Sequence, residues 1–245
     1  MGIFNRQTLK NYFKKGGFAT EKHFVDLIDS SLNSVDDGIS MSPENGLRLN
    51  PFGYTTKVIS FFKKSTQVNP DYSVELNNDD IPGLSINDSN AQSLLKFKED
   101  GSVGIHTNNP SYDFDVKGTT AIESRIGTYK VNTVPGDGNW HDILINLDGV
   151  NAFEVLASIH GKVNSGRYAI AHAFALSTFG GRSSRSKIRS SSAFYGNYFN
   201  KLAFRWKGEM HNYSLQVRTL RHYGIDPIDN LPYKIKYSIT KLLSE

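Results

Sequence analysis

The segment Leu94–Thr119, LLKFKEDGSVGIHTNNPSYDFDVKGT, decides which fold this chain is expected to adopt. Apolar residues stand at every second position in three short pieces of it, at 95–97, 103–105 and 114–116. Two alternating apolar residues supply one face of a short strand, but they do not supply a core. Such strands usually bury that face against copies of themselves, in sequence repeats or in an intertwined oligomer. The segment therefore predicts a thin β-stranded assembly.

The same segment carries a recognisable motif. Residues 100–118, DGSVGIHTNNPSYDFDVKG, resemble the pattern DG-x-VGIGT-x-x-P-x-x-x-LDVKG of bacteriophage tail fibres and tail spikes. His106 stands where that pattern usually has glycine, and Phe114 stands where it has leucine. The resemblance implies a trimeric, β-structured neck ahead of a C-terminal domain. The neck residues assigned to the trimer interface are Val103, Ile105, Phe114 and Val116.

Residues 1–38 are expected to form a helical segment for assembly or attachment. After a short helix within 6–15, Thr20 has the character of an N-cap, and apolar residues follow at helical spacing up to the turn at 36–38. Two interpretations stay open for this helix: it packs within its own domain, or it joins a trimeric bundle or a larger particle. The predicted assembly residues are Phe24, Leu27, Ile28 and Leu32, and Val35 continues the spacing.

The N-terminal string at residues 9–39, LKNYFKKGGFATEKHFVDLIDSSLNSVDDGI, carries a second resemblance. It is similar to the N-termini of phage-tail-like and contractile-injection-system proteins from Bacteroidetes-type bacteria. Residues 39–124 then read as a β-stranded shaft that leads into the neck, with candidate strands at 46–49, 57–62, 72–76 and 84–86. Acidic residues at 79, 80 and 88 do not have the spacing of an EF-hand loop, and turn chemistry explains them better.

Residues 125–245 differ in character and are predicted to form an antiparallel β-sandwich or a jelly roll. Turn signals separate strand-like runs at 141–147, 152–159, 167–178, 187–195, 201–207, 212–219 and 233–242. In 167–178, alanines alternate with bulkier residues, so one face lets another layer approach closely and the strand is expected to be central. The opening at 134–149, VPGDGNWHDILINLDG, resembles a pattern VP-x-DG-x-WHDIL-x-x-LDG in proteins of the same kind of particle. The predicted fold class is mainly β, with an N-terminal α-helix, a short-stranded trimeric shaft and a C-terminal sandwich.

The composition of the chain limits which classes of protein it can belong to. The 245 residues include no cysteine, which excludes disulfides and thiolate chemistry, and no apolar run of 18 residues, which argues against membrane insertion. The N-terminus lacks the apolar core of a secretory signal. Residues 1–119 hold 12 Lys and Arg against 15 Asp and Glu, a net charge of −3, whereas residues 120–245 hold 16 against 9, a net charge of +7. The positive charge of residues 120–245 either favours binding to an anionic partner or only keeps the surface of the protein soluble.

The sequence shows no pattern that indicates catalysis. It lacks a phosphate-binding glycine loop, HExxH and GxSxG, and its seven histidines are scattered without metal-ligand spacing. His141, Asp142 and Glu154 can be drawn as a triad, but most chains of this length allow such a drawing. His172 is interpreted as a hydrogen-bonded core histidine. We therefore predict no enzyme, no cofactor and no bound metal.

Two features are candidates for ligand binding. The basic, serine-rich segment after Gly180 and Gly181 either contacts anionic groups or is a solvated loop. Aromatic side chains in the C-terminal half either stack on sugars or pack in the core. These aromatics are Trp140, Tyr195, Tyr198, Trp206, Tyr213 and Tyr223. The predicted ligand-binding residues are Tyr195, Tyr198, Arg182, Arg185, Lys187 and Arg189.

The predicted function is that of a trimeric, tail-fibre-like structural protein of a phage or contractile injection particle. The expected partners are two further copies of the chain, other particle proteins through the N-terminal segment, and a glycan on a bacterial or target-cell surface. The chain would be made in the bacterial cytoplasm and act in the virion or extracellular particle. One alternative is a cap, collar or baseplate component that binds only its neighbours. Nucleic-acid binding is a third, disfavoured class, which would show strong salt dependence.

Overall fold

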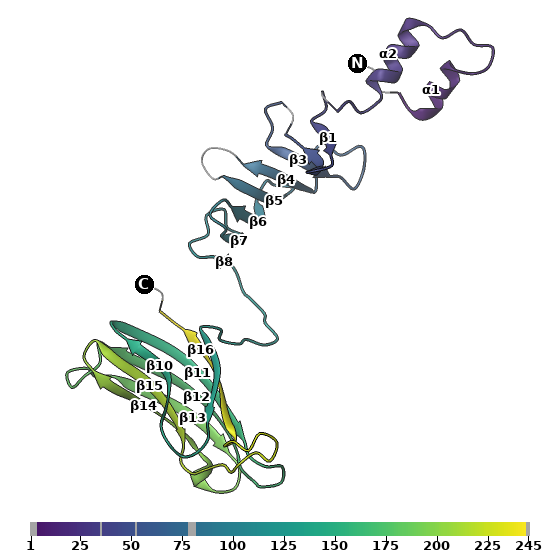
Figure 1. The fold of residues 1–245 in the computed structure, drawn as a ribbon. Coiled ribbons are helices and arrows are strands. Elements are labelled where there is room, and N and C mark those ends of the chain that lie inside the picture. Colours follow the sequence, from purple (N-terminus) through teal and green to yellow (C-terminus); the bar gives the residue numbers. More distant parts are fainter. Residues whose placement is uncertain (1–3, 35, 52, 78–81, 244–245) are drawn as a thin grey trace. The chain divides into compact units, whose positions relative to one another are not determined.

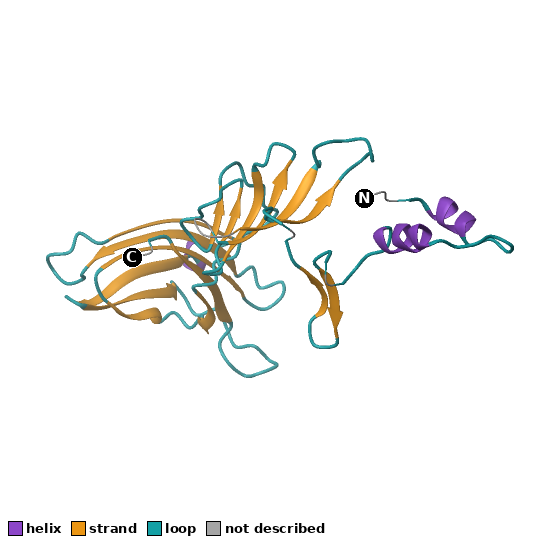
Figure 2. Cartoon of the chain, turned by 90° about the horizontal axis from the view of Figure 1, so that it is seen from above, coloured by secondary structure: helices purple, strands orange, loops and turns teal. Residues whose placement is uncertain are grey.

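A computed structural model describes residues 4–34, 36–51, 53–77 and 82–243 of the chain (Figure 1). The chain divides into two compact units, residues 1–121 and residues 122–245. Strands dominate both units, and two helices precede them, which confirms the prediction of a mainly β chain with N-terminal helix (Figure 2). Within the described residues, no helix is long and apolar enough to cross a membrane. The division of the chain at residues 38 and 124 stays a prediction.

The N-terminal unit begins with helices α1, Arg6–Tyr12, and α2, Glu21–Asp29. Thr20 is the N-cap of α2, as predicted, and its backbone N–H donates to Nδ1 of His23 at 3.3 Å. The helix ends earlier than the apolar spacing suggested, because the hydroxyls of Ser30 and Ser31 donate to backbone carbonyls one turn back and compete with the helical bonds. Leu32 therefore lies outside the helix, which corrects its predicted helical position and leaves its assembly role a prediction, and Val35 lies outside the described residues.

Two sheets follow the helices in this unit. A hairpin of β1 and β2 is separate from a six-stranded sheet whose spatial order is β3-β4-β5-β6-β7-β8. Neighbours in that sheet are antiparallel except for β7 and β8, which are parallel. The strands are β1 Ile39–Ser42, β2 Gly46–Leu49, β3 Lys57–Phe61, β4 Tyr72–Asn77, β5 Gly83–Asp88, β6 Ser93–Lys98, β7 Val103–Ile105 and β8 Phe114–Val116.

One face of the six-stranded sheet buries polar side chains. Ser73, Glu75, Ser85 and Lys96 are buried there. The hydroxyl of Ser73 donates to one oxygen of Glu75 at 2.7 Å, and that of Thr56 donates to the other at 3.1 Å. Burial acts to raise the pKa of Glu75, but these hydrogen bonds outweigh it and hold the pKa below its ordinary value. Because this face is polar, the alternating apolar residues lie on the opposite face.

The C-terminal unit contains two antiparallel sheets, of spatial order β13-β12-β11-β16-β9 and β10-β15-β14 (Figure 1). Buried side chains from both sheets form a single hydrophobic cluster, so the sheets face one another across a common core. The sequence indicated all of these strands except β9. They are β9 Lys130–Pro135, β10 His141–Leu147, β11 Val150–His160, β12 Tyr168–Thr178, β13 Lys187–Phe194, β14 Leu202–Glu209, β15 Asn212–Thr219 and β16 Lys234–Lys241.

Strand β12 shows how closely the two sheets approach. It pairs with β11 on one side and β13 on the other, so its predicted central position is confirmed. Its alanine face, with Ala171, Ala173 and Ala175, is the buried one. Its bulkier face, which includes Ile170 and Phe174, is exposed. The small side chains let the other layer come close, and the large ones are left on the outside of the sheet.

The chain enters the C-terminal unit along the last strand, β16. Thr128 forms a parallel bridge with Ile239, and Gly127 lies so close to the strand that a Cβ would stand 2.3 Å from Oγ1 of Thr240. A glycine is therefore required at this crossing. Arg125 forms an ion pair with Glu154 on strand β11. Residues 125–128, which we call the entry segment, are thus fixed to the outer side of the five-stranded sheet.

Tyr223 is a buried core residue whose hydroxyl donates to the backbone carbonyl of Asn200. Burial raises its pKa to about 12, although Arg221 and Arg167 act in the opposite direction. Because the folded-state pKa lies above the ordinary value of 10.0, the stabilisation is complete below pH 10 and is lost as the pH rises through about 12. Burial also raises the pKa of Tyr237, so we expect an absorbance titration to show a late group of tyrosines that ionises together with alkaline unfolding. This late step should lose one tyrosine in Tyr223→Phe, and ionisation of every tyrosine near pH 10 in folded protein would contradict the assignment.

Candidate functional site

The apolar face of the six-stranded sheet is a candidate assembly surface, which we call the neck face. Its side chains stand in register across the strands: Val74, Ile86, Leu95 and Ile105 form one row. A second row runs beside it, from Leu76 in β4 to Phe114 in β8. The members of the neck face are Ile59, Phe61, Tyr72, Val74, Leu76, Leu84, Ile86, Leu95, Phe97, Val103, Ile105, Phe114 and Val116.

The neck face contains the four neck residues that the sequence assigned to a trimer interface. Parallel pairing of β7 with β8 places Val103 opposite Phe114 and Ile105 opposite Val116. Phe97 is 41% exposed and Phe114 is 62% exposed, so the described part of the chain leaves much of this face uncovered. The sequence found four of the thirteen members, because it did not show that a continuous sheet aligns the shaft strands with the neck.

Helix α2 presents a second uncovered apolar surface. Phe24, Leu27 and Ile28 are all exposed, and the residue that the helix buries is Asp26. Aromatic contacts hold the two helices together: the rings of Tyr12 and His23 stack at 4.1 Å between centroids. Phe24 also contacts the ring of Phe13 edge-on, at 5.4 Å between centroids, yet it remains 51% exposed, so most of the apolar surface of α2 is left uncovered by the described chain.

The predicted ligand-binding residues do not form one site. Tyr195 and Tyr198 follow the end of β13, whereas Arg182 and Arg185 lie in the turn that precedes its start. Strand β13 has eight residues, which separates these groups by about 25 Å. Lys187 and Arg189 lie on the strand between them. The structure thus separates the basic segment from the aromatic pair.

Tyr195 lines a cavity of about 480 Å³ at one end of the five-stranded sheet, which we call the aromatic cavity. The ring of Tyr168 lies 6.4 Å from that of Tyr195 and 5.7 Å from that of His160, measured between centroids. Ser158 adds a hydroxyl to the lining. Tyr198 is not part of this lining and contacts Phe194 edge-on at 5.9 Å. The sequence missed His160 and Tyr168, which become neighbours because they face each other across β11 and β12.

The remaining candidate aromatic side chains already have packing partners within the C-terminal unit. Tyr213 and Tyr223 are buried in the core, and Trp206 packs against it. The guanidinium groups of Arg205 and Arg218 lie 4.3 Å and 4.5 Å from the centroid of the Trp140 ring. These contacts use the rings for packing and cation–π interactions, so the exposed aromatics Tyr195 and Tyr198 are the ones left for a ligand.

The triad drawn from His141, Asp142 and Glu154 is not assembled. His141 pairs with Asp137 at 2.8 Å, and Glu154 pairs with His172 at 2.8 Å. His172 is hydrogen-bonded as expected, but it lies on the exposed face of β12, which corrects its interpretation as a core histidine. Among the described residues, no group of three or more His, Asp and Glu side chains is placed to hold a metal ion.

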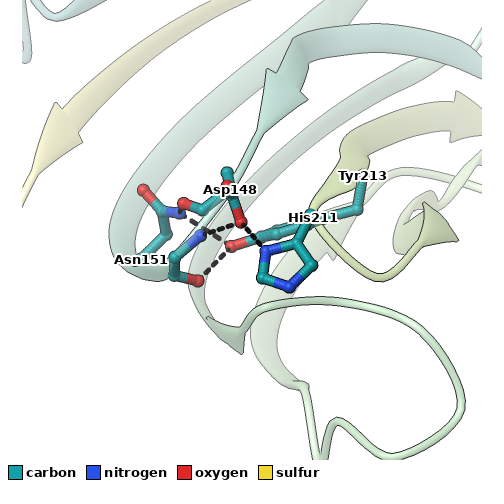
Figure 3. Close-up of polar contacts among 5 residues, drawn as sticks. Asp148, Asn151, His211 and Tyr213 are labelled. Atoms are coloured by element: carbon teal, nitrogen blue, oxygen red, sulfur yellow. Dashed lines mark hydrogen bonds and ion pairs between the residues drawn. The ribbon is translucent and has the colours of Figure 1, made fainter.

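A hydrogen-bonded cluster around Asp148 joins two turns at one end of the C-terminal unit (Figure 3). Asn151 donates to the hydroxyl of Tyr213 at 2.7 Å, and that hydroxyl donates to the carbonyl of Gly149 at 3.0 Å. Asp148 accepts from the backbone N–H of Gly149, and its carboxylate lies 2.8 Å from Nδ1 of His211. These two bonds hold the pKa of Asp148 below its usual value. These contacts tie residues 148–151 to residues 211–213, so the role of the cluster is to fix the turns.

Two solved structures are partly similar to this chain. One is a tailspike protein, gp49 of the Acinetobacter baumannii bacteriophage Fri1, a capsular polysaccharide depolymerase, with 11% identity and a TM-score of 0.27. The other is the tailspike protein of the Acinetobacter phage vB_ApiP_P1, with 14% identity and a TM-score of 0.31. The alignments cover 46% and 56% of this chain but only 19% and 24% of the two tailspikes. No protein-family model matches the chain, and no curated protein matches it.

The first of these structures corrects one prediction. A capsular polysaccharide depolymerase is an enzyme, which contradicts the prediction that the chain is not an enzyme. We withdraw that prediction. The chain spans less than a quarter of the length of either tailspike.

Proposed function

We propose that this chain is a structural protein of a phage tail or a contractile injection particle, that it assembles as a homotrimer, and that its C-terminal unit binds a cell-surface glycan. The observation that carries the proposal is the neck face, a continuous set of apolar side chains of which six are exposed and the others only half-buried in the described chain. Exposed apolar sheets are prone to association, and soluble proteins rarely keep them without a partner. The tail-fibre motif in the neck supports a partner made of two further copies.

The trimer proposal follows from the two faces of the six-stranded sheet. On the polar face, the buried carboxylate of Glu75 is satisfied internally by the hydroxyls of Ser73 and Thr56. The neck face is not covered by another part of the described chain. Burial of each half-exposed phenylalanine or leucine would stabilise an assembly by about 1 kcal/mol or more. Three sheets that turn their neck faces toward one axis would supply the missing core.

Helix α2 is proposed to attach the trimer to its particle or to extend the trimer interface. Its exposed residues Phe24, Leu27 and Ile28 form an apolar stripe on a helix that needs a partner. Leu32 is 79% exposed beyond the helix and is available to the same partner. The particle proteins that would receive it are further tail or baseplate components.

The glycan proposal rests on the aromatic cavity of the C-terminal unit, whose two facing sheets we take as an antiparallel β-sandwich. Tyr195 and Tyr168 offer ring faces, and Ser158 and His160 offer hydrogen-bonding groups in the same cavity. Small ligands bind in hollows of this composition, with apolar walls and a few polar groups. Each site would be weak, and three sites on one shaft would raise the effective affinity through avidity.

The test is binding of the full-length protein to host cells and to a panel of purified bacterial surface polysaccharides. Tyr195→Ala should weaken binding about tenfold or more, because loss of one aromatic anchor costs about 1–2 kcal/mol. Tyr54→Ala, at an exposed tyrosine of the N-terminal unit, is the matched control and should leave binding unchanged. A trimer that binds no cell and no polysaccharide would favour the alternative of a cap, collar or baseplate component.

A further inference from the structure

The outer side of the five-stranded sheet carries an exposed apolar patch in the C-terminal unit. On β12, Ile170 and Leu176 bracket Phe174 on the exposed face, and Leu156 of β11 lies diagonally beside them. The entry segment and β9 add two further residues, which line a cavity of about 360 Å³ together with Leu156 and Ile170. We call this set the outer patch. Its members are Ile126, Val131, Leu156, Ile170, Phe174 and Leu176, each between 44% and 69% exposed.

The charged groups inside the outer patch neutralise one another. Glu154 lies between His172, at 2.8 Å from one carboxylate oxygen, and Arg125, which pairs with the other. Unpaired like charges on facing surfaces would oppose contact between identical patches. Here the one central carboxylate already has two partners from its own chain. Lys187 and Arg189 of the edge strand β13 stand opposite Leu176 and Phe174, and Lys236 of β16 lines the same cavity as Leu156, so these three exposed cations border the outer patch.

The size of the outer patch indicates the kind of partner. Six apolar side chains, each about half exposed, present on the order of 500 Å² of apolar surface. That is near the upper end for the largest patch on a monomer, yet it is below the roughly 800 Å² per partner of a stable independent interface. A free protein would therefore bind it weakly. A copy that is already tethered nearby would bind it well, because tethering raises the effective concentration to the millimolar range.

We infer that the outer patch docks against the outer patches of the other copies of this chain, so that the C-terminal units assemble around the apolar surface of the five-stranded sheet. This inference rests on the proposed trimer, which supplies the tether. The hollows beside Leu156 give a facing copy a place for projecting side chains such as Phe174. The aromatic cavity borders the outer patch at Ile170, which lines both, and it extends from there to the His160 end of the sheet.

The absence of cysteine from the sequence allows a direct test in the full-length chain. Leu176→Cys and Phe174→Cys each place one thiol in the outer patch, and Lys207→Cys places a thiol on the exposed outer side of the other sheet. If about nine-tenths of the units are docked, a maleimide should label the patch thiols about tenfold more slowly than the Lys207→Cys thiol. Far-ultraviolet circular dichroism confirms that each variant is folded.

Light scattering on the same samples separates the possible failures. Slow labelling in a trimer, which becomes fast when Phe97→Asp is added to disrupt the neck face, supports the inference. A trimer whose patch thiols react as fast as the Lys207→Cys thiol overturns the inference and leaves the proposed trimer standing. A monomer of 27.4 kDa overturns the proposed trimer and, with it, this inference.

Discussion

Phe97→Asp should convert the protein from a trimer of about 82 kDa, three times 27.4 kDa, to a monomer. Phe97 lies in the middle of the neck face, opposite Leu84 on one side and Val103 on the other. In an assembled trimer the new carboxylate would be buried without a partner, which is one of the most destabilising single changes. Multi-angle light scattering at micromolar concentration measures the outcome.

The control for this variant is Val68→Asp in the same unit. Val68 is 92% exposed in the segment between β3 and β4, so the same kind of substitution adds a charge that stays in water. It should leave the mass unchanged. Ile28→Asp tests in the same way whether helix α2 is needed for the trimer, and it separates the contribution of α2 to trimer formation from that of the neck face. A Phe97→Asp protein that remains a trimer would show that the neck face is not the interface.

Phe153→Ala is expected to lower the unfolding free energy of the C-terminal unit by about 3–5 kcal/mol. Phe153 is fully buried in strand β11, and its ring stacks with that of Tyr129 at 5.6 Å between centroids. The truncation leaves a cavity between the two sheets, because a close-packed core relaxes only in part. Urea denaturation followed by tryptophan fluorescence reports this unit, since both tryptophans, Trp140 and Trp206, lie in it.

Phe199→Ala is the matched control for the core variant. Phe199 is 56% exposed, and the hydrogen bond it makes to Asn197 comes from its backbone N–H, which the substitution keeps. Its loss should cost less than about 1 kcal/mol. Equal destabilisation by the two variants would contradict the assignment of the core to the space between the sheets.

Local alternation in the sequence predicted most of the strands. The run 212–219 coincides with β15, and the runs at 141–147 and 187–195 agree with β10 and β13 within one residue. Strand β9, Lys130–Pro135, was not predicted; it pairs with β16 at two positions only, Val134 with Ile235 and Pro135 with Lys234. Helix α2 was predicted too long because apolar spacing continues to Leu32, whereas the hydroxyls of Ser30 and Ser31 end the helix first.

The candidate surfaces were harder to predict, because they depend on which face of each strand is covered. Bulky residues ordinarily mark the inner face, yet β12 turns Ala173 inward and Phe174 outward. The sequence also could not show that Arg185 and Tyr195 lie at opposite ends of β13, since they are only ten positions apart. It contained Tyr168 and His160, but only strand pairing brings them beside Tyr195.

The crossing of Gly127 over β16 also has a mechanical consequence. Under the proposed function, a C-terminal unit that is held by a surface while its particle moves would be under tension, and that force would enter the unit through the entry segment at Thr128. The parallel bridge to Ile239 passes the pull to β16, which pairs over six positions with β11. Force along such strands acts in shear on many hydrogen bonds at once instead of peeling them one by one. The unit is therefore anchored at a strand that is paired on both sides, with β11 and with β9.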